Sequence, residues 1–385
     1  MLAGAVAALV SGGISICDAF YAVQPEVMFF LFGMFIVGEA VSASGYVWRV
    51  SAYIRKVAKT TDRLLILLIG VIAVASAVLM NDTVAIIGTP LVLSLALRYN
   101  IPPVAILLTL CFSLTTGSVP SPIGNPQNLL IVSYLNPENP FLLFFSGLIV
   151  PTLISLLFIF IIMRGRFKDS FPRNLSDEAF YSLSASPQEP DQRLIFATRL
   201  SLFILVCMIV LHSIGPRFCE WASFPLGYIA LVAALPILVI ARQRVSILSA
   251  IDWRTLIFFA AMFVLMQSVY NSGWFQASVP FSSITSVPLI FAAGIILSQF
   301  ISNVPFIALF QPAILASGIT TSGILSLAAG STIAGNLTIL GAASNVIVIQ
   351  QAEKYGIQIS FLDFLYVGLP LTIIQGVVFA LWLVI

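Results

Sequence analysis

Long apolar runs, separated by short polar segments, make up most of the chain. Nine of these runs are predicted to cross a membrane as helices: Leu2 to Ile16, Val27 to Trp48, Ile101 to Leu135, Phe141 to Met163, Leu194 to Ser213, Phe224 to Ala241, Leu256 to Tyr270, Ile324 to Gln351 and Phe361 to Ile385. Two further apolar stretches, about 64–98 and about 287–317, are each interrupted near the middle by polar residues. We therefore predict nine crossings and two re-entrant hairpins.

The polar interruptions are predicted to form the hairpin tips. Asn81-Asp82-Thr83 interrupts the first stretch and Ser302-Asn303-Val304 interrupts the second. Pro90 and Pro312 each lie nine residues after the shared asparagine, which indicates that the two stretches are copies. Asp82 could serve only as a helix cap. Because a carboxylate inside a bilayer is costly, we expect a functional role for it instead.

Two of the spanning runs, about 101–135 and about 322–352, are too long for one crossing and contain helix-breaking residues. The first break is expected within Thr115 to Asn128, and the second within Gly335 to Asn345. Gly124 and Asn128 match Gly341 and Asn345, with the same spacing of four residues. Both runs are therefore predicted to unwind near their middle.

The matched positions predict an inverted repeat. Residues 1–163 and 224–385 are expected to form the two repeats, joined by a cytoplasmic linker at 164–193 and a connecting helix at 194–213. That helix supplies the odd crossing that inverts the second copy. The predicted fold is an all-α polytopic membrane protein with an inverted repeat, two re-entrant hairpins and two broken helices, which is typical of secondary transporters.

Composition and charge agree with this assignment. Hydrophobic residues make up 60% of the chain and charged residues 8%, far from the composition of a soluble domain. Of the 17 Lys and Arg residues, all except Arg217 fall on one side of the predicted crossings. The positive-inside rule makes that side cytoplasmic. We therefore expect a multi-pass protein of the plasma (inner) membrane, with its amino terminus in the cytoplasm and its carboxyl terminus outside.

The tips and breaks are predicted to meet near mid-membrane and to bind the solute. Helix amino ends favour anions there, while the carbonyl groups at helix carboxyl ends suit sodium. The candidate binding residues are Asn81, Asp82, Thr83, Gly124, Asn125, Gln127, Asn128, Ser302, Asn303, Gly341, Ser344 and Asn345. Asp82 and Glu39 are the candidate proton sites, and sodium is expected near Asn81, Asp82 and Asn303. The four cysteines form no CxxC motif, so no metal centre or cofactor is expected.

These motifs resemble the ion-transporter superfamily over nearly the whole chain. Within it they are similar to the branch that groups arsenite permeases (ArsB), NhaD-type sodium/proton antiporters and citrate-transporter-like proteins. The resemblance implies a transport domain of hairpins and broken helices that moves like an elevator against a scaffold, and it implies a homodimer. Divalent-anion symporters of this superfamily carry Ser-Asn-Thr at both tips, whereas this chain has Asn-Asp-Thr and Ser-Asn-Val.

We expect a secondary active transporter of an anion or oxyanion, such as a carboxylate or an arsenite-like solute, coupled to protons or sodium. The alternative is a sodium/proton antiporter, supported by Asp82 and Asn81. A channel would need a continuous pore with a filter of carbonyls or charged rings, and no TVGYG-like stretch occurs. An enzyme would need a nucleophile with a base, or a metal motif such as HExxH, but the chain has one histidine, His212. The expected partners are a small ion and the lipid bilayer, and not nucleic acid.

Overall fold

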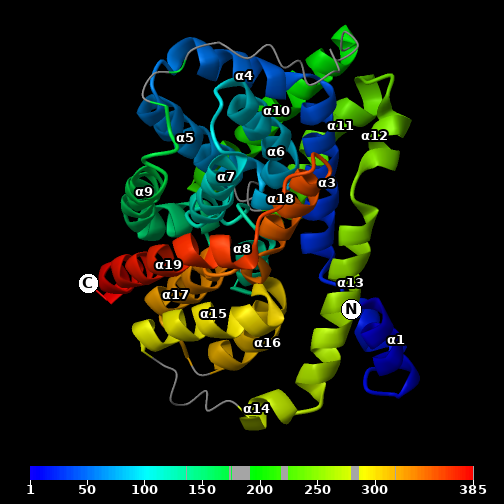
Figure 1. The fold of residues 1–385 in the computed structure, drawn as a ribbon. Helices are drawn as coiled ribbons and strands as arrows, with labels where there is room; N and C mark the ends of the chain where they lie inside the picture. Colours follow the sequence, from blue (N-terminus) through cyan, green and yellow to red (C-terminus); the bar gives the residue numbers. More distant parts are fainter. Residues whose placement is uncertain are drawn as a thin grey trace.

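The computed structural model describes residues 1–135, 137–172, 175, 191–217, 224–278, 286–316 and 318–384. These residues form helices and no strand (Figure 1). The fold class predicted from the sequence is confirmed.

Among the described residues, six helices are long and apolar enough to cross a membrane: α3 (Pro25–Ala43), α5 (Thr61–Leu79), α9 (Pro140–Arg166), α10 (Gln192–Ile214), α13 (Trp253–Asn271) and α19 (Phe361–Val384). Shorter apolar helices are α7 (Pro103–Ser118), α11 (Gly227–Ile240), α15 (Val287–Ile301) and α16 (Asn303–Ala316). The remaining α-helices are α1 (Leu2–Val10), α2 (Ile16–Ala22), α4 (Tyr46–Val57), α6 (Asn81–Arg98), α8 (Pro126–Leu135), α12 (Arg244–Ala250), α14 (Trp274–Ser278), α17 (Thr321–Ile333) and α18 (Ala343–Glu353).

The hairpins and the helix breaks occur where the sequence predicts them. Helices α5 and α6 form the first hairpin and α15 and α16 the second, and one residue separates the two arms in each. The first broken helix is α7 followed by α8, and its non-helical segment contains Pro120 and Pro122, which have no backbone N–H to donate. The second is α17 followed by α18. Its break contains no proline and forms two short 3-10 turns, Ala334–Asn336 and Ile339–Gly341.

Corresponding helices pack in corresponding pairs. Helix α5 packs on α7 as α15 packs on α17, and α7 packs on α9 as α17 packs on α19. These helices form two sets, α5 to α9 and α15 to α19. The two sets also contact each other, because α6 packs on α18 and α16 packs on α8. Helix α3 packs on α11, and α1 packs on α13. The breaks of the two broken helices therefore lie in the middle of the molecule, between the two hairpins (Figure 1).

Small residues allow the close packing within each set. A Cβ atom added to Gly117 of α7 would lie 2.3 Å from Cα of Ala73 in α5. In the other set, a Cβ on Gly330 of α17 would lie 2.6 Å from the carbonyl oxygen of Phe291 in α15. In both pairs the obstructing atom belongs to the backbone, so only glycine fits. This is the small-residue packing used by helices in lipid, where the hydrophobic effect does not drive helices together.

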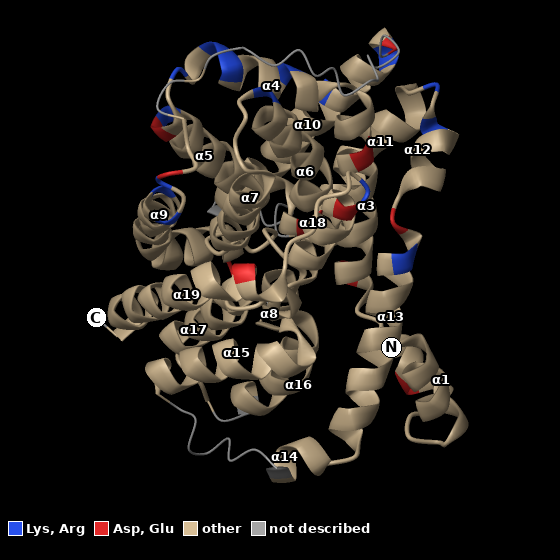
Figure 2. Cartoon of the chain, viewed as in Figure 1, with Lys and Arg blue, Asp and Glu red and all other residues tan. Residues whose placement is uncertain are grey.

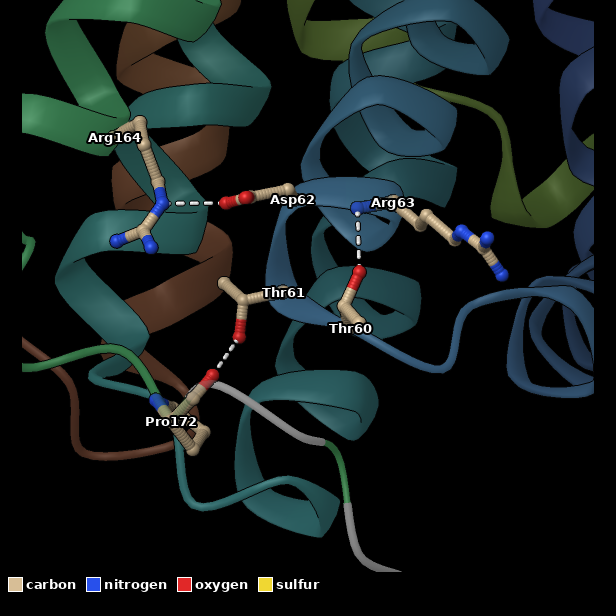
Figure 3. A network of polar contacts seen from close by, with 6 residues as sticks. All are labelled: Thr60, Thr61, Asp62, Arg63, Arg164 and Pro172. Carbon is tan, nitrogen blue, oxygen red and sulfur yellow. Dashed lines mark hydrogen bonds and ion pairs between the residues drawn. The ribbon is translucent and has the colours of Figure 1, made fainter.

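Charged residues gather along one side of the molecule, over α4, α12 and the beginning of α5 (Figure 2). On this side the end of α9 is tied to the first hairpin (Figure 3). Arg164 pairs with Asp62, and the hydroxyl of Thr61 donates a hydrogen bond to the carbonyl of Pro172. The Thr60 hydroxyl caps α5 by accepting a hydrogen bond from the backbone N–H of Arg63 at 3.4 Å.

One predicted crossing is wrong. Residues 2–16 do not form a continuous spanning helix, because α1 has nine residues and ends at Val10. At 1.5 Å per residue it is about 14 Å long, roughly half of the hydrocarbon core. Gly12 follows with a φ of 74°, a left-handed conformation that turns the chain before α2. The predicted linker at 164–193 lies mostly outside the described residues, and its first residues continue α9 to Arg166.

Candidate functional site

The two hairpin tips and the two helix breaks enclose one cavity of about 50 Å³. Five predicted site residues lie on its wall: Asn81, Asp82, Gln127, Ser302 and Asn303. The rest of the wall is formed by Pro126, Val304, Pro305, Ala342, Ala343, and Phe258 and Phe259 of α13. About 10–15 Å³ on this measure holds one water molecule, so the cavity is large enough for an ion or a small polar group. Residues far apart in the sequence thus surround one polar space.

The cavity wall carries side-chain oxygens that accept no hydrogen bond. The Oδ1 atoms of Asn81 and Asn303 and the Oδ2 atom of Asp82 are buried and have no donor among the described residues. Asp82 itself is 2% exposed. A buried polar atom without a partner is unfavourable, and a buried carboxylate without one is more so. A proton on Asp82, or a cation coordinated by these oxygens, would remove that cost.

Four helices begin at this cavity. Helices α6 and α16 start at Asn81 and Asn303, and α8 and α18 start at Pro126 and Ala343. The amino end of a helix carries unpaired N–H groups and a partial positive charge, which favour an anion. The cavity therefore combines oxygens that suit a cation with helix ends that suit an anion.

The first tip is fixed to the surrounding breaks by hydrogen bonds. The backbone N–H of Asn81 donates to the carbonyl oxygen of Gly124 at 2.8 Å, and its side-chain amide donates to the Ser344 hydroxyl at 3.4 Å. A Cβ on Gly124 would lie 2.3 Å from the carbonyl oxygen of Ser118. Gly124 and Ser344 thus hold the tip in place, and neither lies on the cavity wall.

Asn128 and Asn345 lie in the first turns of α8 and α18, directly after the breaks. The side-chain amide of Asn128 donates to the carbonyl oxygen of Ser121 at 2.9 Å, and that of Asn345 donates to the carbonyl oxygen of Gly335 at 2.5 Å. Both asparagines are fully buried and lie off the cavity wall. The sequence predicts that both bind the solute. Their contacts differ from that prediction because unwinding a helix leaves carbonyl groups unpaired, and these amides are the nearest donors.

Gly341 and Asn125 also support the breaks. A Cβ on Gly341 would lie 2.4 Å from the carbonyl oxygen of Ala334. The side-chain amide of Asn125 donates to the hydroxyls of Ser118 at 3.0 Å and of Thr332 at 3.3 Å. The Asn125 contact joins the first break to α17, because Thr332 belongs to that helix.

Sequence reasoning missed several polar residues of this region. Thr332 also accepts a hydrogen bond from Gln127, at 3.4 Å. Asn336 donates to Thr116 at 3.0 Å and to Gln375 of α19 at 2.8 Å, and all three are fully buried. The sequence contains one signal for Thr332. Thr332 and Thr115 are separated by the same number of residues as Gly341 and Gly124, so the repeat pairs Thr332 with Thr115. No comparable match indicates Gln375, which lies within an otherwise apolar run.

A second polar space, a vestibule of about 530 Å³, lies beside the first tip. Thr83, the residue after Asp82, lines the vestibule and not the central cavity. Gly38 and Glu39 of α3 also line it. A Cβ on Gly38 would lie 2.4 Å from Cγ2 of Thr83, so α3 and the hairpin are in close contact here. Glu39 is half-buried in this vestibule, apart from the cavity that Asp82 lines.

Known transporters share this architecture. The YdaH transporter of Alcanivorax borkumensis, described as having an unusual topology, superposes with a TM-score of 0.60 over 94% of this chain and 84% of its own, at 15% sequence identity. At that identity the similarity concerns the fold alone. Its match over most of both chains supports the arrangement of helices described above.

Sequence comparisons identify the class of protein. A transporter of Mycobacterium tuberculosis is 26% identical over 99% of this chain and 92% of its own length. The silicon efflux transporter LSI3 of Oryza sativa subsp. japonica is 26% identical over 97% of this chain and 89% of its own. The model of the citrate transporter family (CitMHS) matches residues 1–328. The chain is a membrane transporter, not an enzyme, and belongs to the citrate transporter family.

Proposed function

We propose that this protein is a secondary active transporter of a small anion, a carboxylate or an oxyanion, and that a proton or sodium ion bound at Asp82 drives the transport. One observation carries the proposal. Asp82, with an unpartnered buried oxygen, and the amino ends of four helices border the same cavity between the two tips. The description of the family as citrate transporters supports a carboxylate, and the silicon efflux activity in the name of the rice relative supports an oxyacid.

Electrostatics explains why the anion and the cation would move together. Two like charges 4 Å apart repel by roughly 4 kcal/mol at an effective dielectric constant of about 20. An ionised Asp82 on the cavity wall would therefore oppose the binding of an anion. A proton or sodium ion at Asp82 removes this repulsion, so the anion binds well only to the cation-loaded protein. Such a difference in affinity is the basis of coupled transport.

The proposed movement is of the elevator type implied by the resemblance. The hairpins and the broken helices would move together, because α5 and α7, and α15 and α17, are packed through backbone contacts at glycine. Helices α3, α10 and α11 pack on one another and would form the scaffold. The Gly38–Thr83 contact then lies between the moving and fixed parts. We also retain a homodimer in the plasma membrane, with the charged side cytoplasmic, as part of the proposal.

A sodium/proton antiporter is the second candidate. It is favoured by the unpartnered oxygens of Asn81, Asp82 and Asn303, which suit a cation without any anion. In this mechanism sodium and the proton would compete for Asp82. The helix amino ends at the cavity are what favour the anion transporter over this alternative.

Uptake into proteoliposomes tests the proposal. Purified protein is reconstituted and supplied with labelled citrate, succinate, phosphate or arsenite, under an inward proton gradient, an inward sodium gradient or neither. We expect one anion to accumulate above its external concentration under one of the gradients, with saturation and counterflow, which a channel does not show. Exchange of sodium for protons without any requirement for an anion would instead establish the antiporter.

A further inference from the structure

We propose that the vestibule beside the first tip captures the anion before it reaches the cavity, and that Arg254 and Lys354 provide the attraction. This inference rests on the proposed function, because it takes the solute to be an anion. The ligand class is a small carboxylate or oxyanion. Arg254 and Lys354 lie outside the twelve residues that the sequence indicated.

The vestibule leads to the tip that carries Asp82. Thr83 lines the vestibule and Asp82 lines the cavity, so the first turn of α6 separates the two spaces. Helix α18 connects them as well, because Ala343 at its start lies on the cavity wall and Gln350 near its end lines the vestibule. Ala343 and Gln350 are about two helix turns apart, so the vestibule lies close to the proposed binding site.

Four charged residues line the vestibule: Glu39, Asp252, Arg254 and Lys354. Asp252 is engaged by its own helix, since it accepts hydrogen bonds from the backbone N–H of Thr255 at 3.0 Å and from the Thr255 hydroxyl at 2.7 Å. Arg254 makes no ion pair among the described residues, and Lys354 donates to the neutral Gln351 at 3.0 Å. The vestibule thus carries two cations and two carboxylates, and neither Arg254 nor Lys354 pairs with a carboxylate among the described residues.

A buried hydroxyl adds a second, independent observation. The Oγ1 atom of Thr83 is buried, has no hydrogen-bond partner among the described residues, and belongs to a residue that is 2% exposed. A hydroxyl can donate to a carboxylate or an oxyanion. Thr83 at the tip end of the vestibule, with Arg254 and Lys354 on the surrounding helices, thus provides a neutral donor and two charges for one anion. A cation without a carboxylate partner can bind an anion through charge-assisted hydrogen bonds.

Kinetics of anion uptake test this role. Lys354→Gln and Arg254→Gln are compared with wild type, with Lys59→Gln and Arg63→Gln as controls, because the control residues are exposed on the same charged side but do not line the vestibule. We expect each vestibule variant to raise KM about three- to tenfold with Vmax unchanged, and to weaken the salt dependence of KM. Lys354→Arg keeps the charge and should retain the wild-type KM.

The outcomes separate the two proposals. If wild type accumulates an anion but KM and its salt dependence are unchanged in both vestibule variants, the capture site is wrong and the proposed function stands. A loss of Vmax at constant KM, or an equal rise of KM in the controls, also contradicts the capture site. If wild type accumulates no anion, the proposed function fails and the capture site fails with it. Elution volume and melting temperature of each variant show whether it is folded.

Discussion

Met80 and Ser302 adopt the same rare backbone conformation at the two hairpin tips. Their φ angles are 70° and 67°, and their ψ angles are 141° and 164°. Each is the single residue between the two arms of its hairpin, and the two precede Asn81 and Asn303. This region of φ and ψ is close to one that only glycine adopts readily, and a residue held there costs of order 1–3 kcal/mol. Both tips therefore carry strain at the proposed binding site.

Replacing Ser302 by glycine should relieve that strain. We expect Ser302→Gly to raise the free energy of unfolding by about 1 kcal/mol, because glycine has no Cβ to clash at positive φ. The measurement is the melting temperature in detergent. Ser286→Gly is the matched control, since Ser286 lies at the start of the same hairpin with a φ of −80° and should gain nothing. Equal effects of the two substitutions would show that Ser302 is not strained.

Glycine at the contact between α5 and α7 gives a second prediction. Gly117→Ala should destabilise the protein by several kcal/mol or prevent folding, because its Cβ would overlap the Ala73 backbone. Gly70 lies within α5 and has no atom within 4 Å of an added Cβ. Gly70→Ala should therefore be neutral or stabilise by up to about 1 kcal/mol through helix propensity. Thermal unfolding of the two variants in parallel measures both effects, and a stable Gly117→Ala variant would contradict the close packing.

Asn128→Ala should reduce stability as well as transport. The substitution leaves the carbonyl of Ser121 without its side-chain donor in a buried break. The expected loss is about 1–3 kcal/mol in the free energy of unfolding. Asn271→Ala is a control, because Asn271 is exposed and distant from the cavity. An Asn128→Ala variant with wild-type melting temperature and a higher KM would show that Asn128 binds the solute, as the sequence had suggested.

The orientation of the charged side can be tested by labelling. Single cysteines that replace Arg98 and Arg242 should react with a membrane-impermeant thiol reagent from the same side of the membrane. The reason is that both belong to the set of basic residues that the positive-inside rule places in the cytoplasm. A background without Cys17, Cys111, Cys207 and Cys219 is used. Labelling from opposite sides would contradict the predicted crossings between these two positions.

Helix lengths and breaks could be predicted from the sequence because they depend on local chemistry. A run of spanning length favours a helix in lipid. The pair Pro120 and Pro122 favours a break, although single prolines such as Pro151 and Pro370 lie inside α9 and α19. The prediction of a continuous helix at 2–16 was wrong, and the reason was also local, because the chain turns at Gly12. Apolar length alone did not reveal it.

The side-chain contacts of the site were less predictable. Asn81 and Asn128 are both asparagines in the first turn of a helix, yet Asn81 lines the cavity and Asn128 donates to carbonyls of the preceding break. Whether such an asparagine faces the cavity or the backbone depends on how the chain bends between the helices. Packing between the two sets of helices determines that bend. Arg254 and Lys354 were missed for a related reason. At membrane edges most basic residues only face solvent, and the vestibule that distinguishes these two exists only in the folded protein.

Coupling through Asp82 is the central claim, and accumulation by Asp82→Asn tests it most directly. Wild type, Asp82→Asn and Asp363→Asn are reconstituted, and anion accumulation is measured under a proton gradient and then under a sodium gradient. Asp363 is the control, an exposed aspartate in the first turn of α19. We predict that Asp82→Asn exchanges the anion but no longer accumulates it under either gradient, whereas Asp363→Asn behaves as wild type. Wild-type accumulation by Asp82→Asn, with unchanged dependence on both gradients, would contradict the claim. Asp82 would then have only a structural role in the first turn of α6.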